Sequence, residues 1–179
     1  MKVVILAGGR GSRISEESLY KPKPLIEIGG KPIIWHIMKH YSHYGFNDFI
    51  ICCGYKGYLL KEYFVNYYMH NSDITVDLKC NNLEIKKNNS EPWKVSLIDA
   101  GENTMTGGRI LKLKNILNKE KNFFLTYGDG VSDINIKKLL RFHHKNNKLA
   151  TISVVKPQGR YGMIDLNKNA YVKKFAEKP

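Results

Sequence analysis

The chain has 179 residues, of which 42% are hydrophobic and 25% are charged, so it can bury one sizeable core and residues 1–179 are expected to form a single domain. No stretch approaches the roughly 18 apolar residues of a membrane span, and the apolar run before Gly8 is too short for a signal peptide. The sequence therefore predicts a cytoplasmic protein that does not contact a membrane, with a net charge of +13 that favours anionic ligands.

Predicted strands and helices alternate along the chain. Short apolar runs predict buried strands and apolar residues at helical spacing predict helices, with Pro32 suited to a first helical turn and Gly45 to a helix exit. The expected elements are a strand at 3–7, a helix between Pro32 and Gly45, a strand at 49–53, a helix at 58–68, strands at 74–78 and 95–98, a helix at 109–117, a central strand at 123–127, a helix at 136–144 and a strand at 150–155. This order predicts an α/β fold, Rossmann-like, with a mixed, mostly parallel sheet flanked by helices.

The cysteines and two closely spaced histidines suggest structural roles. Cys52 and Cys53 are adjacent in an apolar run, and with Cys80 they make an odd number, which favours reduced thiols over disulfides or a metal site. His36 and His40 lie four residues apart on a predicted helix, a spacing that metal sites use, but no further ligand is near them in the sequence. We therefore expect both histidines to be structural.

The first predicted strand runs directly into a glycine-rich segment. Glycines lack a Cβ, so their N–H groups can approach phosphate oxygens closely. The predicted nucleotide contacts in this segment are Leu6, Ala7, Gly8, Gly9, Arg10, Gly11, Ser12 and Arg13. Neither a dinucleotide fingerprint, which would need glycine at Ile14, nor a P-loop, which would need Gly-Lys-Ser/Thr, fits the spacing. An ordinary strand-to-loop connection is the alternative.

Lys23 follows this segment between Pro22 and Pro24. Two prolines restrict the backbone on either side, so the lysine can be aimed at a ligand. We expect Lys23 and Arg13 to supply the catalytic positive charge and Lys23 also to bind the nucleotide; a solvated surface lysine is the alternative.

These segments closely resemble the glucose-1-phosphate cytidylyltransferases, a branch of the sugar nucleotidyltransferases, over essentially the whole chain. The segments that carry the resemblance are LAGGRGSR, KPKPLIEIGGKPIIWHIMKHY, DFIICCGYKG, EPWKVSLIDAG, MTGGR, FFLTYGDGVSD and FAEKP. Arg10 and Ser12 are mild departures from the usual pattern. The resemblance implies transfer of a cytidylyl group from CTP to α-D-glucose 1-phosphate, giving CDP-glucose and pyrophosphate. The alternatives are a relative that uses UTP or dTTP and a non-catalytic nucleotide-binding module.

Asp129 lies between Gly128 and Gly130, directly after the predicted strand at 123–127. Ligands of parallel sheets gather beyond the carboxyl ends of strands, so Asp129 and the glycine-rich segment should share one edge. A carboxylate suits Mg²⁺, although Asp-Gly is also a common turn pair. The resemblance implies that Asp129 is a ligand of the cofactor Mg²⁺ and that Gly128 contacts the nucleotide.

The resemblance also assigns the base and sugar sites. It places the pyrimidine near Thr104 and Arg109, where the alternative is a threonine-capped helix with a surface arginine. It places the sugar phosphate at Glu177 and Lys178. Family members continue past this motif and there supply a second metal-binding aspartate, so the C-terminal portion of the family fold is expected to be absent from residues 1–179. We expect the 179-residue chain to turn over little, and full-length members to form homo-oligomers.

The high positive charge raises one further possibility, a nucleic-acid-binding module. The lysines are scattered along the chain, and no helix-turn-helix, zinc-finger or RNP-type signature accompanies them. Two polyanionic substrates explain the charge equally well. We therefore expect CTP and glucose 1-phosphate, and no nucleic acid, as partners.

Overall fold

The computed structural model describes residues 1–9, 20–155, 163–168 and 171–176. Contacts divide the chain into two compact units, Met1–Ile136 and Lys137–Pro179. The larger unit contains β1 (Val3–Leu6), the 3-10 helix η1 (Lys23–Leu25), β2 (Glu27–Ile28), β3 (Lys31–Pro32), α2 (Ile33–His43), β4 (Asp48–Cys53), α3 (Gly57–His70), β5 (Ser72–Asp77), β6 (Asn82–Asn88), β7 (Lys94–Asp99), α4 (Thr106–Lys112), α5 (Lys114–Leu117) and β8 (Phe124–Tyr127). Then follow α6 (Ile136–Asn146), β9 (Met163–Leu166) and β10 (Val172–Ala176). A single domain over the whole chain stays a prediction.

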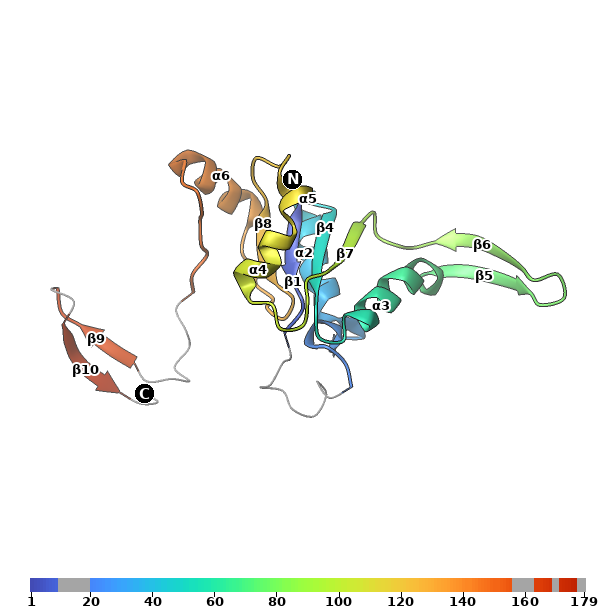
Figure 1. The fold of residues 1–179 in the computed structure, drawn as a ribbon, viewed down its shortest axis with the longest axis horizontal. Coiled ribbons are helices and arrows are strands. Elements are labelled where there is room, and N and C mark those ends of the chain that lie inside the picture. Colours follow the sequence, from blue (N-terminus) through green and yellow to red (C-terminus); the bar gives the residue numbers. More distant parts are fainter. Residues whose placement is uncertain (10–19, 156–162, 169–170, 177–179) are drawn as a thin grey trace. The chain divides into compact units, whose positions relative to one another are not determined.

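A parallel sheet forms the centre of the larger unit (Figure 1). Its four strands lie in the order β7-β4-β1-β8, with Val3 opposite both Phe49 and Phe124. The strand β1 is completely buried, as its short apolar run predicts for an inner strand of a parallel sheet. The predicted α/β fold with a mostly parallel sheet flanked by helices is confirmed.

Helices cover both faces of this sheet. On one face Val4, Leu6, Ile50 and Cys52 pack against Leu113 and Leu117 of the α4–α5 segment. On the other face, α2 buries Ile34, Ile37, Met38 and Tyr41. Tyr41 contacts Phe124 there, with ring centroids 5.5 Å apart. None of the helices in the described ranges has both the length and the hydropathy to cross a bilayer.

Several element predictions need correction. The predicted helix at 109–117 is two helices, which meet at Leu113. The strand predicted as central at 123–127 lies at an edge of the described sheet, and Leu125 and Tyr127 are exposed there. Residues 150–155 form no strand, because they find no hydrogen-bonded partner among the described strands.

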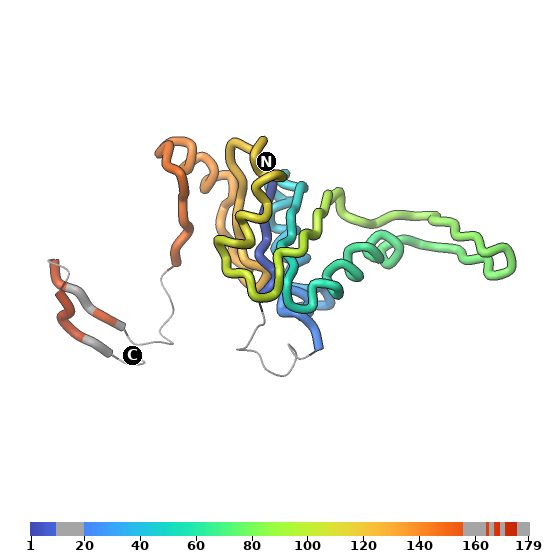
Figure 2. The backbone as a smooth tube through the Cα atoms, in the orientation of Figure 1, coloured from blue at the N-terminus to red at the C-terminus, as the bar shows by residue number. Residues whose placement is uncertain are grey.

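The strand predicted at 74–78 is real but lies outside the central sheet. It is β5, which pairs with β6 in an antiparallel hairpin that was not predicted. The sequence of β6 is mostly polar, NLEIKKN, so it carries only a weak strand signal. Figure 2 shows this hairpin running away from the sheet beyond α3.

Candidate active site

A pocket of about 530 Å³ opens at the carboxyl ends of β1 and β8. Parallel strands direct their carboxyl ends to one edge of the sheet, which is where ligands of such sheets bind. The pocket is lined by Leu6, Ala7, Gly8, Gly9, Lys23, Pro24, Glu102, Asn103, Thr104, Met105, Thr106, Arg109, Tyr127, Gly128 and Asp129. It therefore brings together every predicted nucleotide or metal residue that the structure describes.

The structure describes only part of the predicted site. Arg10, Gly11, Ser12, Arg13, Glu177 and Lys178 lie outside the described residues. The pocket also includes residues that were not predicted as ligands: Pro24, Glu102, Asn103, Met105, Thr106 and Tyr127. Pro24 and Tyr127 directly neighbour predicted residues in the chain, Glu102, Asn103 and Met105 belong to the loop before α4, and Thr106 is the first residue of α4. The residues that flank each motif were therefore the available signal.

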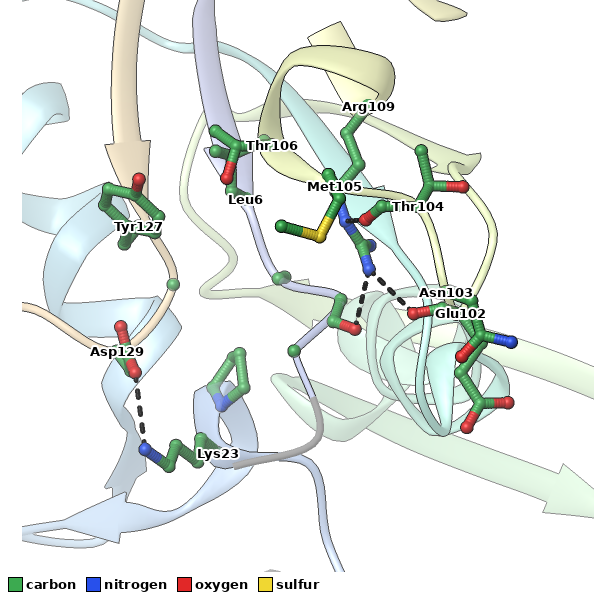
Figure 3. A pocket seen from close by; sticks show the side chains of 15 residues that line it. Leu6, Lys23, Glu102, Asn103, Thr104, Met105, Thr106, Arg109, Tyr127 and Asp129 are labelled. Atoms are coloured by element: carbon green, nitrogen blue, oxygen red, sulfur yellow. Dashed lines mark hydrogen bonds and ion pairs between the residues drawn. The ribbon is translucent and has the colours of Figure 1, made fainter. Parts of the chain in front are cut away.

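Two groups of polar side chains face each other across this pocket (Figure 3). Lys23 and Asp129 lie on one side, and Arg109 with the loop Glu102–Met105 lies on the other, with the end of β1 passing between them. The pocket can therefore hold a ligand that offers anionic groups at one end and hydrogen-bonding groups at the other.

Lys23 is held in place by its neighbours. Pro22 is extended before it, and Pro24 and Leu25 of η1 are buried, which anchors the backbone on both sides of the lysine. The Lys23 Nζ lies 3.6 Å from Asp129 Oδ2, where the lysine side chain is 16% exposed and the aspartate 46%. The pair therefore remains accessible to a ligand that enters the pocket.

Arg109 is buried, which its sequence context did not predict. Its Nε donates to the carbonyl of Thr104 at 2.8 Å, and Nη2 donates to those of Gly8 and Glu102 at 3.0 and 3.1 Å. Nη1 lies 3.5 Å from the carbonyl of Cys53. The guanidinium thus joins the ends of β1 and β4 to the loop before α4, and most of its donors are used within the protein.

Packing explains two of the glycines around the pocket. A Cβ on Gly8 would overlap the Arg109 guanidinium, and a Cβ on Gly128 would lie 3.0 Å from Pro24 Cγ and 3.3 Å from Ala7 Cβ. A Cβ on Gly9, by contrast, would meet nothing within 4 Å. Gly8 is thus needed for the approach of Arg109 in addition to any approach to phosphate.

The donor chemistry of the pocket fits a magnesium ion bound mainly through ligand and water oxygens. Asp129 offers a half-exposed carboxylate at the pocket edge. Within the described ranges no three His, Cys, Asp or Glu side chains gather into a metal site. Mg²⁺ keeps several waters and commonly bridges phosphate oxygens to one or two carboxylates, so a single aspartate is compatible with it.

The histidines and two of the cysteines have structural roles, as expected. His36 Nε2 lies 2.9 Å from the carbonyl oxygen of Ile28, and His40 Nε2 lies 2.8 Å from that of Ile134. Burial raises the pKa values of the Cys52 and Cys53 thiols to about 11, so both are protonated near neutral pH. Cys80 is free and exposed.

The whole chain is similar to known nucleotidyltransferases. The sequence profile of the family described as Nucleotidyl transferase matches residues 2–179. Glucose-1-phosphate cytidylyltransferase from Salmonella typhimurium is 51% identical over 179 residues, which are 100% of this chain and 69% of the relative. The probable glucose-1-phosphate cytidylyltransferase of Bacillus subtilis is 41% identical over 99% of this chain and 69% of its own length.

Solved structures share the fold. HddC from Yersinia pseudotuberculosis complexed with GMP-PN matches with a TM-score of 0.59 and 25% identity, over 99% of this chain and 69% of that one. A UDP-glucose pyrophosphorylase complexed with UDP-glucose matches with a TM-score of 0.57 and 19% identity over the same shares of both chains. The fold is thus that of the nucleotide-diphospho-sugar transferases.

Proposed function

The chain belongs to the glucose-1-phosphate cytidylyltransferases of the nucleotidyl transferase family, and from this we propose that it transfers a cytidylyl group from CTP to α-D-glucose 1-phosphate. The products are CDP-glucose and pyrophosphate. The observation that carries the proposal is the pocket at the ends of β1 and β8, where Lys23 and Asp129 face the loop that contains Thr104.

The reaction needs positioning and charge stabilisation, and no covalent enzyme intermediate. A phosphate oxygen of glucose 1-phosphate attacks the α-phosphorus of CTP in line, and the bond from that phosphorus to the departing pyrophosphate breaks. Lys23, which lines the pocket, stabilises the negative charge on the phosphoryl oxygens, together with Arg13.

The remaining roles follow the arrangement of the pocket. The backbone from Leu6 to Arg13 and at Gly128 binds the triphosphate, and Thr104 hydrogen-bonds the pyrimidine. Arg109 contributes to base binding mainly by holding the loop before α4 in place, because its guanidinium donates to the carbonyl of Thr104 in that loop. Glu177 and Lys178 bind the sugar and its phosphate.

We further propose that Asp129 holds Mg²⁺, which neutralises the triphosphate when bound. The free thiols of Cys52, Cys53 and Cys80 fit a reducing compartment, and we place the enzyme in the cytoplasm. We also propose that the full-length enzyme forms a homo-oligomer.

The experiment that tests this function compares nucleotides. The protein is incubated with Mg²⁺, glucose 1-phosphate and each nucleoside triphosphate, while pyrophosphate release and nucleotide binding by calorimetry are measured. We expect CTP to be preferred in both measurements. Equal or better binding of UTP or dTTP would contradict the cytidylyl assignment. Because residues 1–179 are expected to turn over little, it is CTP binding without turnover by a full-length enzyme that would favour a non-catalytic nucleotide-binding module.

A further inference from the structure

The two histidines of α2 make the same kind of hydrogen bond to different parts of the chain. His36 Nε2 lies 2.9 Å from the carbonyl oxygen of Ile28 in β2, whereas His40 Nε2 lies 2.8 Å from that of Ile134, which is 94 positions further along the chain. A carbonyl oxygen only accepts hydrogen bonds, so each Nε2 carries a hydrogen and donates it. His40 thus fastens a distant segment to α2.

The segment that His40 holds begins with the candidate metal ligand. We call residues 129–135, which connect β8 to α6, the Asp129 loop; all of them are described, and they contain no helix or strand. Hydrogen bonds hold this loop near both ends, because the amide of Gly128 donates to the carbonyl of Leu6 at 2.9 Å and His40 donates to that of Ile134. The Asp129 side chain is 46% exposed, so its position depends on how the loop is held.

Aromatic neighbours hold the imidazole of His40 in turn. Its ring makes edge contacts with Tyr41 and Tyr44, with centroids 6.2 and 5.4 Å apart. The Tyr41 ring packs against Phe124, the first residue of β8. Such contacts restrict the ring to one orientation, so His40 presents its N–H in a fixed direction. The helix α2 therefore contacts both the strand that leads into the Asp129 loop and the far end of that loop.

The same helix also supports Lys23. It packs against η1, which contains Lys23. Lys23 and Asp129 face each other on one side of the pocket, with Nζ 3.6 Å from Oδ2 (Figure 3). The distance between these two groups depends on how η1 and the Asp129 loop are each attached to α2.

We propose that His40 is a positioning residue for the metal site. By holding the carbonyl of Ile134 it keeps the Asp129 loop, and with it the Asp129 carboxylate, where Mg²⁺ and the nucleotide phosphates meet. The inference rests on the proposed role of Asp129 as the residue that holds Mg²⁺. His40 does not line the pocket, so it acts through the loop and not on the ligand. Without this hydrogen bond the loop would have to be ordered when the metal binds, which lowers the affinity.

Hydrogen exchange followed by mass spectrometry tests whether His40 holds the loop. His40→Leu removes the donor, and the amides of residues 130–135 should then exchange about fivefold faster, the factor expected for the loss of one hydrogen bond. His40→Gln keeps an N–H at the same number of bonds from the backbone and should exchange like wild type. The matched control is His36→Leu, which loses the equivalent bond to Ile28 and should leave the exchange of residues 130–135 unchanged. Unchanged exchange in His40→Leu would overturn the proposal.

Calorimetry tests whether the loop positions the metal ligand. The affinity for CTP is measured with saturating Mg²⁺ and with EDTA, and the ratio of the two values is the Mg²⁺ gain. We expect the wild-type gain in His40→Gln and His36→Leu, and a gain about fivefold smaller in His40→Leu. The affinity in EDTA should stay the same, because His40 lies outside the pocket, whereas general damage to the fold would lower both affinities.

The variant His40→Phe repeats both measurements with an aromatic ring that can still pack against Tyr41 and Tyr44 but has no donor. It should behave like His40→Leu, so the proposal stays testable even where the leucine variant does not fold. Faster exchange of the loop together with an unchanged Mg²⁺ gain would show that the loop does not position Asp129, and would overturn the proposal.

A double variant tests whether His40 acts through Asp129. Asp129→Asn should lose the Mg²⁺ gain, and adding His40→Leu should lower it no further, because both changes affect the same metal contact. Additive losses would overturn the proposal. Loss of the gain in Asp129→Asn but not in His40→Leu would refute the role of His40 alone. An unchanged gain in Asp129→Asn would refute the metal role of Asp129, and the inference about His40 with it.

Discussion

The guanidinium of Arg109 donates a hydrogen bond from Nη2 to the carbonyl of Gly8 at 3.0 Å, although the two residues are 101 positions apart in the chain. The contact connects the end of β1 to the first turns of α4, and both residues line the candidate active site. Because a Cβ on Gly8 would occupy the place of the guanidinium, the glycine and the arginine depend on each other. The shape of the pocket therefore depends on this pair.

Gly8→Ala should destabilise the protein, because the added methyl group displaces Arg109 from its carbonyl partners. We expect a loss of about 1–3 kcal/mol in unfolding free energy and a lower melting temperature without nucleotide. Differential scanning fluorimetry measures the change. Gly9→Ala is the matched control, since its Cβ meets nothing within 4 Å, and equal melting temperatures for the two variants would contradict the packing role of Gly8.

Arg109→Lys keeps the positive charge but cannot reach the carbonyls of Thr104, Gly8 and Glu102 together, because lysine has one donor nitrogen. Losing these buried hydrogen bonds should lower the unfolding free energy by about 3 kcal/mol, as measured by urea titration without nucleotide. Arg141→Lys is the control, because the Arg141 side chain is exposed. If Arg109 acted only on the base, the free protein would keep its stability and only nucleotide binding would weaken.

Lys23→Ala and Asp129→Asn test whether these two residues contribute to catalysis and not to the stability of the fold. The pair is partly exposed, so each variant should keep nearly the same melting temperature. In the full-length enzyme, turnover should fall roughly 100-fold or more if each residue acts on the transition state, as measured by pyrophosphate release. Lys21→Ala removes a neighbouring exposed lysine that pairs with Glu27, and it should keep turnover. Full activity in either of the first two variants would refute its assigned role.

Glu91 should make stability depend on pH at the acid end. Burial raises its pKa, but hydrogen bonds from Tyr67 and Lys39 outweigh that effect and hold the pKa below its usual value of 4.5. A lowered folded-state pKa stabilises the protein above the unfolded-state value, and this stabilisation is lost as pH falls through the folded-state pKa. Stability should therefore decrease as pH falls below about 4.5.

Urea unfolding followed by tryptophan fluorescence between about pH 3 and 7 tests this dependence. Glu91→Gln should be less stable than wild type at neutral pH, and the difference should shrink toward the acid end. Glu84→Gln changes an exposed carboxylate on β6 and serves as the control. A constant difference between wild type and Glu91→Gln over the whole range would show that Glu91 does not contribute through its charge.

Local patterns in the sequence were sufficient for much of the fold. The apolar run at β1, the helical spacing in α2 between Pro32 and Gly45, and the run at β4 all gave elements close to those observed. Asp129 and the glycine-rich segment were also predicted to share one edge, and Gly8, Gly9 and Asp129 line the same pocket. These features depend on neighbours in the chain or on the general rule that parallel strands end at one edge.

Other features could not be predicted from local patterns. The mostly polar β6 forms a strand because β5 lies beside it, and β8 lies at an edge because no described strand pairs with its outer side. The hydrogen-bond partners of a strand are decided by the packing of the whole domain, so a strand signal does not tell where in a sheet the strand will lie.

The sequence by itself determined the family, the alternation of strands and helices and nine of the residues that line the pocket, namely Leu6, Ala7, Gly8, Gly9, Lys23, Thr104, Arg109, Gly128 and Asp129. Only the tertiary structure decided the role of Arg109. From the sequence alone, the TGGR segment is equally compatible with a buried arginine and with a helix start whose arginine lies in solvent. That arginine is buried where the carbonyls of Glu102 and Thr104, in the loop before α4, meet the carbonyl of Gly8 from the end of β1. Buried carbonyls need donors, and where they converge is a property of the folded chain.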